Sequence, residues 1–207
     1  MLTILGKPSS INVRKVLWTC AEIGLDYDLQ PWGAPHMPTS SPEFLRINPR
    51  GLVPVIQHEG ETLWESNTIC RYLASRHGRH DLLPADALAR AQVEKWMDWQ
   101  ATELNNAWRY AFMALVRQSP AHTDPAALAA SVDGWNQAMQ LLEQRLRETG
   151  AFAAGADFTL ADVVLGLSVH RWAATPMAHA ELPAVRAYYE RLSQRPGFLA
   201  HGRNQHP

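Results

Sequence analysis

The stretch from residue 48 to residue 55 reads Asn-Pro-Arg-Gly-Leu-Val-Pro-Val. Its Pro and Gly mark a turn, and the β-branched residues that follow predict a strand over residues 53–57. Glu59-Gly60 is a second turn before another short strand at residues 62–64, so the two strands are predicted to form a hairpin. Ser66 then stands where it can cap a helix whose apolar residues recur on one face. The predicted order here is strand, strand, helix.

The chain before this stretch predicts a strand, a helix and a second strand. Residues 2–5 are a short apolar run followed by a polar turn. Apolar residues then recur at helical spacing over residues 13–21, and Gly24 stands where that helix would end. Residues 25–30 alternate apolar and polar side chains, which is the period of a strand. Four prolines between residues 31 and 42 predict an exposed loop.

The rest of the chain is predicted to be helical after a linker at residues 78–86. Four helices are expected: a long one from Asp86 to about Gln118, one from Asp124-Pro125 to Gly150, one over residues 160–172, and one that follows Pro183 and ends before Pro196-Gly197. The third has almost no charged side chains, so it should be the buried centre of its domain. The sequence therefore predicts an α/β domain over residues 1–77 with the order βαβ-ββα, and an all-α domain over residues 87–207.

Composition and charge limit the kinds of function. Hydrophobic residues make up 46% of the 207 residues, enough to bury a core in a chain of this size. Nineteen Lys and Arg against 20 Asp and Glu give a net charge of −1, so no basic field favours nucleic acid or an anionic membrane. No apolar run approaches the ~18 residues of a spanning helix. With only two cysteines, a disulfide framework is not expected, and the composition predicts a cytoplasmic protein.

Four motifs follow one another along this predicted fold. They are residues 10–14 (Ser-Ile-Asn-Val-Arg), residues 48–55, Glu65-Ser66, and the capping box at residues 159–162 (Thr-Leu-Ala-Asp). Together they resemble the glutathione S-transferase superfamily, in its bacterial cytosolic form with a theta-like or nu-like first turn, over essentially the whole chain. The resemblance implies a thioredoxin-like domain that binds glutathione, a helical domain with a pocket for a second substrate, and a homodimer with a role in detoxification.

The resemblance implies that Ser10 and Asn12 in the first turn carry the chemistry. The Ser10 hydroxyl or the Asn12 amide would donate a hydrogen bond to the glutathione sulfur and so favour the thiolate. Ser10 stands four residues before Arg14, as in the Ser-type members, whereas Asn12 matches a related bacterial and fungal group. Either residue could instead only cap the helix. The sequence leaves the choice open.

The resemblance also implies two further groups that bind glutathione. Ser66 can offer a hydroxyl and an N–H to the γ-glutamyl carboxylate at a helix N-terminus, and Glu65 can pair with the amine beside it. The Val53-Pro54 peptide bond is expected to be cis, with the Val53 backbone free to pair with the cysteinyl part of the tripeptide. Each of these residues also has an ordinary structural explanation, as a helix cap, a charge at a strand end or a trans proline.

The position for the glycyl carboxylate departs from the pattern of the superfamily. Thr39 and Leu52 stand where many relatives carry a charged or amide side chain. Only a hydroxyl and a backbone remain there, so weak binding of glutathione is expected unless His36 or Arg50 reaches the carboxylate.

The helical domain is expected to supply the second-substrate pocket. Asn105, Trp108, Arg109 and Phe112 lie on the long helix where the superfamily usually builds this pocket, although core packing is an equal alternative for Trp108. Trp96 and Met97 lie nearer the helix start and are expected in the core or an interface. Thr159 and Asp162 are interpreted as a structural cap.

The expected activity is a glutathione transferase that uses the glutathione thiolate as co-substrate to attack a small electrophile. One alternative is a glutathione-dependent disulfide or peroxide reductase in which two glutathiones do the redox work. Another is a non-catalytic glutathione-binding or adaptor protein. Neither Cys20 nor Cys70 lies in the first turn, which disfavours a protein-cysteine mechanism. The histidines show no metal-binding pair, so no metal cofactor is expected.

Overall fold

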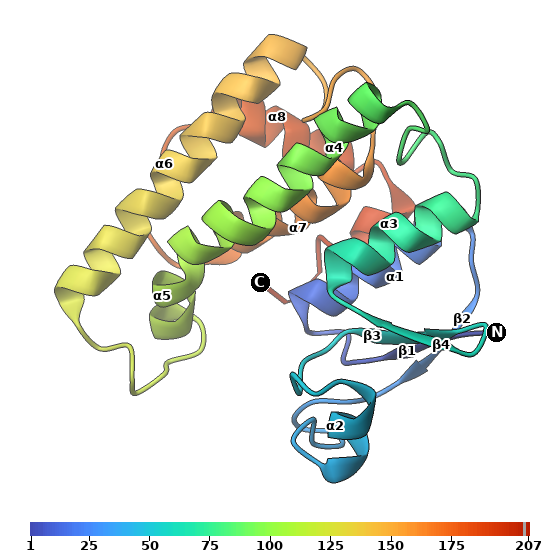
Figure 1. Cartoon of the computed structure of the whole chain (residues 1–207). Coiled ribbons are helices and arrows are strands. Elements are labelled where there is room, and N and C mark those ends of the chain that lie inside the picture. The colour runs from blue at the N-terminus through green and yellow to red at the C-terminus, as the bar shows by residue number, and fades with distance from the viewer. Residues whose placement is uncertain (205) are drawn as a thin grey trace.

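The computed structural model describes residues 1–204 and 206–207 (Figure 1). Its N-terminal part is a four-stranded sheet made of β1 (Leu2–Leu5), β2 (Tyr27–Gln30), β3 (Val55–His58) and β4 (Glu61–Trp64). The strand order is β2-β1-β3-β4, with β1 and β2 parallel and the other pairs antiparallel. This arrangement confirms the predicted βαβ-ββα order.

Three helices accompany the sheet: α1 (Ile11–Ile23), α2 (Pro42–Ile47) and α3 (Ser66–Arg76). Figure 1 shows α1 and α3 side by side between the sheet and the helical part of the molecule, and α2 on the opposite side of the sheet. The prediction missed α2 because its six residues, which begin at Pro42, are too few to show a helical period. Ser41 caps it by accepting a hydrogen bond from the Phe44 N–H at 3.2 Å.

The C-terminal part is helical, as predicted. It contains α4 (Ala87–Trp99), the π-helical segment η1 (Gln100–Leu104), α5 (Asn105–Leu115), α6 (Pro125–Thr149), α7 (Leu160–Ala174), α8 (Pro183–Leu192) and α9 (Pro196–His201). The nearly uncharged helix α7 is buried at the centre and contacts α1, α4 and α8, which confirms its predicted place. Among the described residues, no helix combines the length and apolar content needed to cross a bilayer.

The two parts pack through Trp18 of α1, whose side chain is fully buried. It fits against two glycines, Gly166 of α7 and Gly197 of α9. A Cβ on Gly197 would lie 2.6 Å from Trp18, and a Cβ on Gly166 would lie 2.7 Å from Leu192. Only glycine allows this approach, so the orientation of α1 depends on both positions.

The predicted helix over residues 86–118 is wrong in one respect. It is interrupted by one π turn, η1, whose Gln100 is fully buried. Such bulges come from tertiary contacts and occur often at functional sites, and the apolar pattern does not reveal them. The helix after Pro183 ends before Pro196, as predicted, but the further short helix α9 was not predicted; it begins at Pro196, where proline is favoured as a first helical residue.

Two predicted caps differ in their outcome. Ser66 is the first residue of α3 and not its N-cap, since Glu65 holds that position. The capping box at Thr159 and Asp162 is present, and the Asp162 carboxylate accepts hydrogen bonds from the N–H groups of Thr159 and Ala153, each at 2.9 Å. The Tyr188 hydroxyl donates a further bond at 2.9 Å. Asp162 therefore joins α7, α8 and the loop before α7.

Candidate functional site

One pocket gathers most of the residues that the sequence singled out. It is lined by Asn12, Asn48, Arg50, Leu52, Val53, Pro54, Trp64, Glu65 and Ser66. Four segments meet here: the first turn of α1, the loop before β3, the end of β4 and the first turn of α3. Two predicted residues are not among the lining side chains. Ser10 is half-buried at the N-cap of α1, and Thr39 is half-buried beside Gly51.

The loop before β3 is held in shape by Asn48, which is 2% exposed. Its Nδ2 donates to the Leu52 carbonyl at 2.8 Å, and its Oδ1 accepts from the Arg50 N–H at 3.0 Å. Gly51 has a φ of 62°, and a Cβ there would lie 3.3 Å from the Thr39 carbonyl oxygen, so glycine is required. The Val53-Pro54 bond is cis, as expected. The loop thus presents Arg50, Leu52 and Val53 to the pocket on a fixed backbone.

Glu65 has an unusual backbone for a residue with a side chain. Its φ is 74° and its ψ is 109°, and it is the N-cap of α3 without capping through its side chain. Such a conformation costs of order 1–3 kcal/mol and is concentrated at functional sites. Its side chain stays exposed, while Ser66 beside it is 6% exposed. The strained turn therefore directs the first N–H groups of α3, which have no partner within the helix, toward the pocket.

The first turn of α1 offers two polar side chains. Ser10 is the N-cap of α1, but its hydroxyl makes no capping hydrogen bond, and α1 has no acidic residue in its first turn. Asn12 is half-buried in the wall of the pocket. Both groups are therefore able to donate to an anion placed at the helix N-terminus.

A buried lysine next to this site was not predicted. Lys15 of α1 is 1% exposed, and its ammonium donates to Asn67 Oδ1 at 3.1 Å and to Gln100 Oε1 at 2.8 Å. Burial lowers the pKa of this ammonium to about 8. Position 15 falls outside the apolar stripe of α1, which predicts an exposed residue. It is buried because α1 is covered both by the sheet and by the helical part, and only the tertiary structure reveals this.

The same network reaches the predicted second-substrate residues. Gln100 Nε2 donates to Asn105 Oδ1 at 2.9 Å, and the indole N–H of Trp108 donates to the same oxygen at 3.1 Å. The Trp108 and Phe112 rings meet edge to face, with centroids 5.4 Å apart. Three of the four predicted residues are thus joined, whereas Arg109 is exposed on the same helix. Trp108 also packs against Trp135 of the core, with ring centroids 6.2 Å apart, which agrees with the core-packing alternative for this residue.

The two cysteines of the chain are both buried. Burial raises the pKa of the Cys20 thiol to about 12 and that of Cys70 to about 11, so both are neutral near pH 7. Within residues 1–204 and 206–207, no three His, Cys, Asp or Glu side chains are grouped to hold a metal ion.

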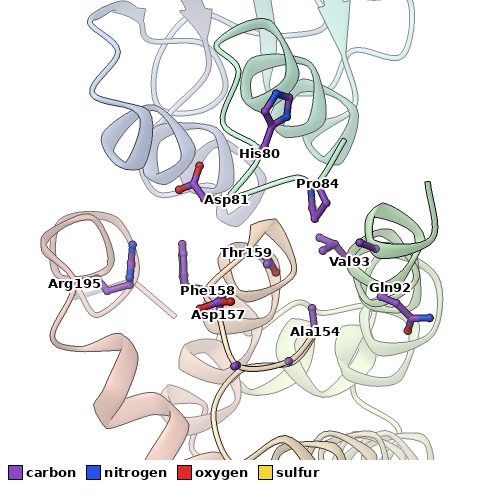
Figure 2. A pocket seen from close by; sticks show the side chains of 13 residues that line it. His80, Asp81, Pro84, Gln92, Val93, Ala154, Asp157, Phe158, Thr159 and Arg195 are labelled. Atoms are coloured by element: carbon purple, nitrogen blue, oxygen red, sulfur yellow. The ribbon is translucent and has the colours of Figure 1, made fainter. Parts of the chain in front are cut away.

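A larger cavity of about 580 Å³ lies elsewhere, where the linker around Asp81 and Pro84 faces the loop before α7 (Figure 2). Arg195 on its wall is already paired with Glu22 at 2.6 Å. Of the predicted site residues it includes only Thr159, which serves as a cap. Size alone does not make this cavity the site, because strained backbone and free donors converge in the smaller pocket.

Comparison with known proteins agrees with this geometry. Residues 9–76 match the N-terminal domain of glutathione S-transferases, and residues 125–191 match the C-terminal domain. Glutathione S-transferase GstB of Escherichia coli (strain K12) is 34% identical over 198 residues, covering 95% of each chain. Glutathione S-transferase 3 of Zea mays is 32% identical over 95% of this chain and 91% of its own.

Solved structures give the same result. The theta-class glutathione S-transferase of the citrus canker pathogen Xanthomonas axonopodis pv. citri, crystallised with glutathione bound, superposes with a TM-score of 0.91. The two chains share 32% sequence identity, and the match covers 98% of this chain and 97% of the other. The sequence, the fold and the arrangement of the pocket thus show that the chain belongs to the glutathione S-transferase family.

Proposed function

We propose that this protein binds glutathione in the pocket between α1, α3 and the loop before β3, and transfers its thiolate to a small electrophile. The observation that carries the proposal is the convergence of Asn12, the Val53 backbone and the strained Glu65-Ser66 turn in one pocket. These groups match, in kind and order, what a γ-glutamyl tripeptide needs.

Each part of glutathione has a partner in this assignment. The γ-glutamyl carboxylate binds the Ser66 hydroxyl and the first N–H groups of α3, and its amine pairs with Glu65. The cysteinyl backbone pairs with Val53 as an added strand. Arg50 lines the pocket, whereas His36 and Thr39 do not, so Arg50 is assigned to the glycyl carboxylate. Leu52 contributes only apolar contact there.

Ser10 and Asn12 are assigned to the sulfur. A thiol of pKa ~8.5 is about 3% ionised at pH 7, and lowering its pKa by ~2 units makes it mostly thiolate. Nucleophilicity falls as the pKa falls, so the net gain from ionisation is only about 2.5- to 4-fold. Most of the acceleration therefore has to come from holding the electrophile against the sulfur, which we assign to the α5 wall of Asn105, Trp108 and Phe112.

Glutathione-dependent disulfide reduction is the second candidate function. It is favoured by Asn12, the first-turn residue that indicates this reaction, because Asn12 lies in the wall of the pocket. In that reaction, the bound thiolate attacks a mixed disulfide of glutathione, oxidised glutathione forms, and the other thiol leaves as a thiolate. Turnover of 1-chloro-2,4-dinitrobenzene against that of a glutathione mixed disulfide separates the two functions. Binding of glutathione without either turnover would contradict both and favour an adaptor role.

We further propose that the protein acts as a homodimer in the cytoplasm. The molar mass from light scattering after size-exclusion chromatography tests the dimer. Fractionation of cells that express the protein tests its location.

A further inference from the structure

A buried lysine of α1 reaches the first turn of α3, where one wall of the proposed glutathione pocket begins. Lys15 is 1% exposed, and its ammonium donates to Asn67 Oδ1 at 3.1 Å and to Gln100 Oε1 at 2.8 Å. Asn67 is the second residue of α3 and is itself 8% exposed. It follows Ser66, which lines the pocket, whereas Lys15 does not. Lys15 therefore acts on a bound ligand through Asn67 and through its charge.

Both amides that receive the ammonium are fixed in orientation. The Asn67 Nδ2 donates to the main-chain oxygen of Met97 at 2.8 Å, and the Gln100 Nε2 donates to Asn105 Oδ1 at 2.9 Å. Since the two nitrogens are committed to these acceptors, the two amide oxygens have to face a donor, and Lys15 is that donor. A side chain without a donor at this position would leave two buried acceptors unsatisfied.

The main chain of Asn67 belongs to the part of α3 that is able to hold an anion. The first main-chain hydrogen bond of this helix runs from the Ile69 N–H to the Glu65 carbonyl at 2.9 Å. The N–H groups of Ser66, Asn67 and Thr68 come before it and have no acceptor within the helix. These are the groups assigned to the γ-glutamyl carboxylate. The buried ammonium therefore holds the side chain of a residue in the anion-binding turn.

Charged and titratable groups from several elements face Lys15. Cys70 and Arg71 belong to α3, Arg171 belongs to α7, and Glu65 is the N-cap of α3, while η1 contributes a neutral amide. Burial lowers the pKa of the Lys15 ammonium to about 8; Cys70 and Glu65 act against this shift, and the two arginines add to it. Burial raises the pKa of Cys70 to about 11. Lys15 is thus charged near pH 7 and loses its charge at a pH where Cys70 is still neutral.

We propose that Lys15 is a positioning residue for glutathione: its ammonium holds Asn67, and with it the first turn of α3, in the arrangement that receives the γ-glutamyl carboxylate. This inference rests on the proposed function, which puts that carboxylate at Ser66. The carboxylate brings a negative charge to the turn that the buried ammonium contacts, so the two charges attract. The amine of the tripeptide offsets part of this attraction, but it pairs with Glu65, whose side chain is exposed to solvent.

The attraction couples binding of the tripeptide to the proton of Lys15. Binding should raise the pKa of the ammonium above its value of about 8 in the free protein. By linkage, the affinity is highest where Lys15 is charged in both states, and it falls as the pH passes from the free pKa to the bound pKa. A rise of about 0.5 to 1 unit corresponds to an affinity that is about 3- to 10-fold lower at about pH 9.5 than near pH 7.

The titration of Lys15 itself tests the proposal without any turnover. The chain has three lysines, so the NMR signals of the ε carbons in a protein with isotopically labelled lysine can be assigned with Lys7→Arg and Lys95→Arg. The ligand is S-methylglutathione, in which a methyl group replaces the titrating proton of the thiol. We expect the pKa of Lys15 to rise by about 0.5 to 1 unit when this ligand saturates the protein. An unchanged or lowered pKa in a protein that binds the ligand overturns the inference and leaves the proposed function intact.

Calorimetry with the same ligand measures the effect on affinity. Lys15→Met should weaken binding near pH 7 by about 3- to 10-fold and should show a smaller fall toward about pH 9.5 than the wild type, because only the amine of the ligand then titrates. Lys15→Arg keeps the charge over this range, so it should recover affinity and show the same small fall. Lys95→Met, which changes an exposed lysine on α4, should behave like the wild type. The same pH dependence in the wild type and Lys15→Met overturns the inference.

A further variant keeps the test decisive if Lys15→Met does not fold. Gln100→Glu retains the lysine and places a carboxylate beside its ammonium, at a position that does not line the pocket. This carboxylate should raise the pKa of Lys15, so the fall in affinity between about pH 7 and 9.5 should be smaller than in the wild type. The control is Gln140→Glu, at an exposed position of α6.

The outcomes for this pair separate the inference from the proposed function. A pH dependence of Gln100→Glu that matches those of the control and the wild type overturns the role of Lys15 while glutathione binding stands. A wild-type protein that does not bind S-methylglutathione at any pH contradicts the proposed function, and the inference with it.

Discussion

The Lys15 ammonium lies 2.8 Å from Gln100 Oε1, so a buried positive charge of α1 is bound to the π turn that joins α4 and α5. The same ammonium donates to Asn67, the residue after Ser66, at 3.1 Å. One side chain therefore links the start of α3, which we assign to glutathione, to the π turn before α5, the helix to which we assign the second-substrate wall. The interface between the N-terminal sheet domain and the helical part is thus polar beside Ser66, at the edge of the proposed glutathione pocket.

Lys15→Met should lower the free energy of unfolding by about 1–3 kcal/mol, because it leaves Asn67 Oδ1 and Gln100 Oε1 buried without a donor. The matched control is Lys95→Met, which changes an exposed lysine on α4. Urea denaturation measures both. A Lys15→Met protein as stable as the control would show that the hydrogen bonds of Lys15 to Asn67 and Gln100 do not contribute to the free energy of unfolding.

Lys15 also gives a pH dependence with a definite sign. Its pKa is about 8 in the folded protein, against 10.5 for the free side chain. Between these values the unfolded chain binds more protons, so this group makes the protein more stable as the pH rises from 8 to 10.5. Subtracting the Lys15→Met curve from the wild-type curve isolates this slope from that of other groups. If the difference in free energy of unfolding between wild type and variant did not change from pH 8 to 10.5, the lowered pKa of a buried Lys15 ammonium would be contradicted.

Glu65→Ala should weaken binding of glutathione by about 10-fold or more, since it removes the carboxylate assigned to the amine. The melting temperature without ligand should hardly change, because the side chain is exposed. Glu65→Gly separates the two roles of this position. It should lose binding in the same way but gain about 1 kcal/mol of stability, because glycine accepts a φ of 74°. Calorimetric titration that finds wild-type affinity in both variants would refute the assignment.

Asp162→Ala should cost about 3 kcal/mol or more, above the ~0.5–2 kcal/mol of an ordinary cap. The carboxylate is fully buried, and its loss leaves the N–H groups of Ala153 and Thr159 and the Tyr188 hydroxyl without their acceptor. Asp86→Ala, at the exposed N-cap of α4, is the control and should cost about 1 kcal/mol. The KM for glutathione should stay unchanged at a permissive temperature. A stable but inactive Asp162→Ala protein would make this residue part of the site.

The fold was predictable from the sequence because its local signals agree with one another. The alternation over residues 25–30, the turn before Val53 and the nearly uncharged helix over residues 160–172 each specify an element and the side that it buries. The pocket was predictable in outline for the same reason. Its residues belong to short motifs at the ends of elements, where the backbone geometry depends on a few neighbouring side chains.

The interface between the two parts was not predictable. Lys15 and Arg171 are charged residues on helices, and their burial depends on what packs against those helices, which no local pattern contains. The π turn at Gln100 has the same origin, since its buried side chain bonds to Lys15 and Ser168 from other helices. The place of Ser66 inside α3 was missed because it depends on the positive φ of Glu65, a conformation that sequence patterns rarely specify for a residue with a side chain.

The most direct test of the account is the titration of bound glutathione, followed by thiolate absorbance, in the wild type and in the Ser10→Ala/Asn12→Ala double variant. We expect the wild type to titrate about 2 units below the free thiol value of ~8.5, and the double variant to return close to that value. One hydrogen bond to an ionised sulfur is worth ~1.5–3 kcal/mol, so the single variant that removes the main donor should move the curve by roughly 1 to 2 units. A double variant that binds glutathione and titrates like the wild type would contradict the assignment of Ser10 and Asn12 to the sulfur.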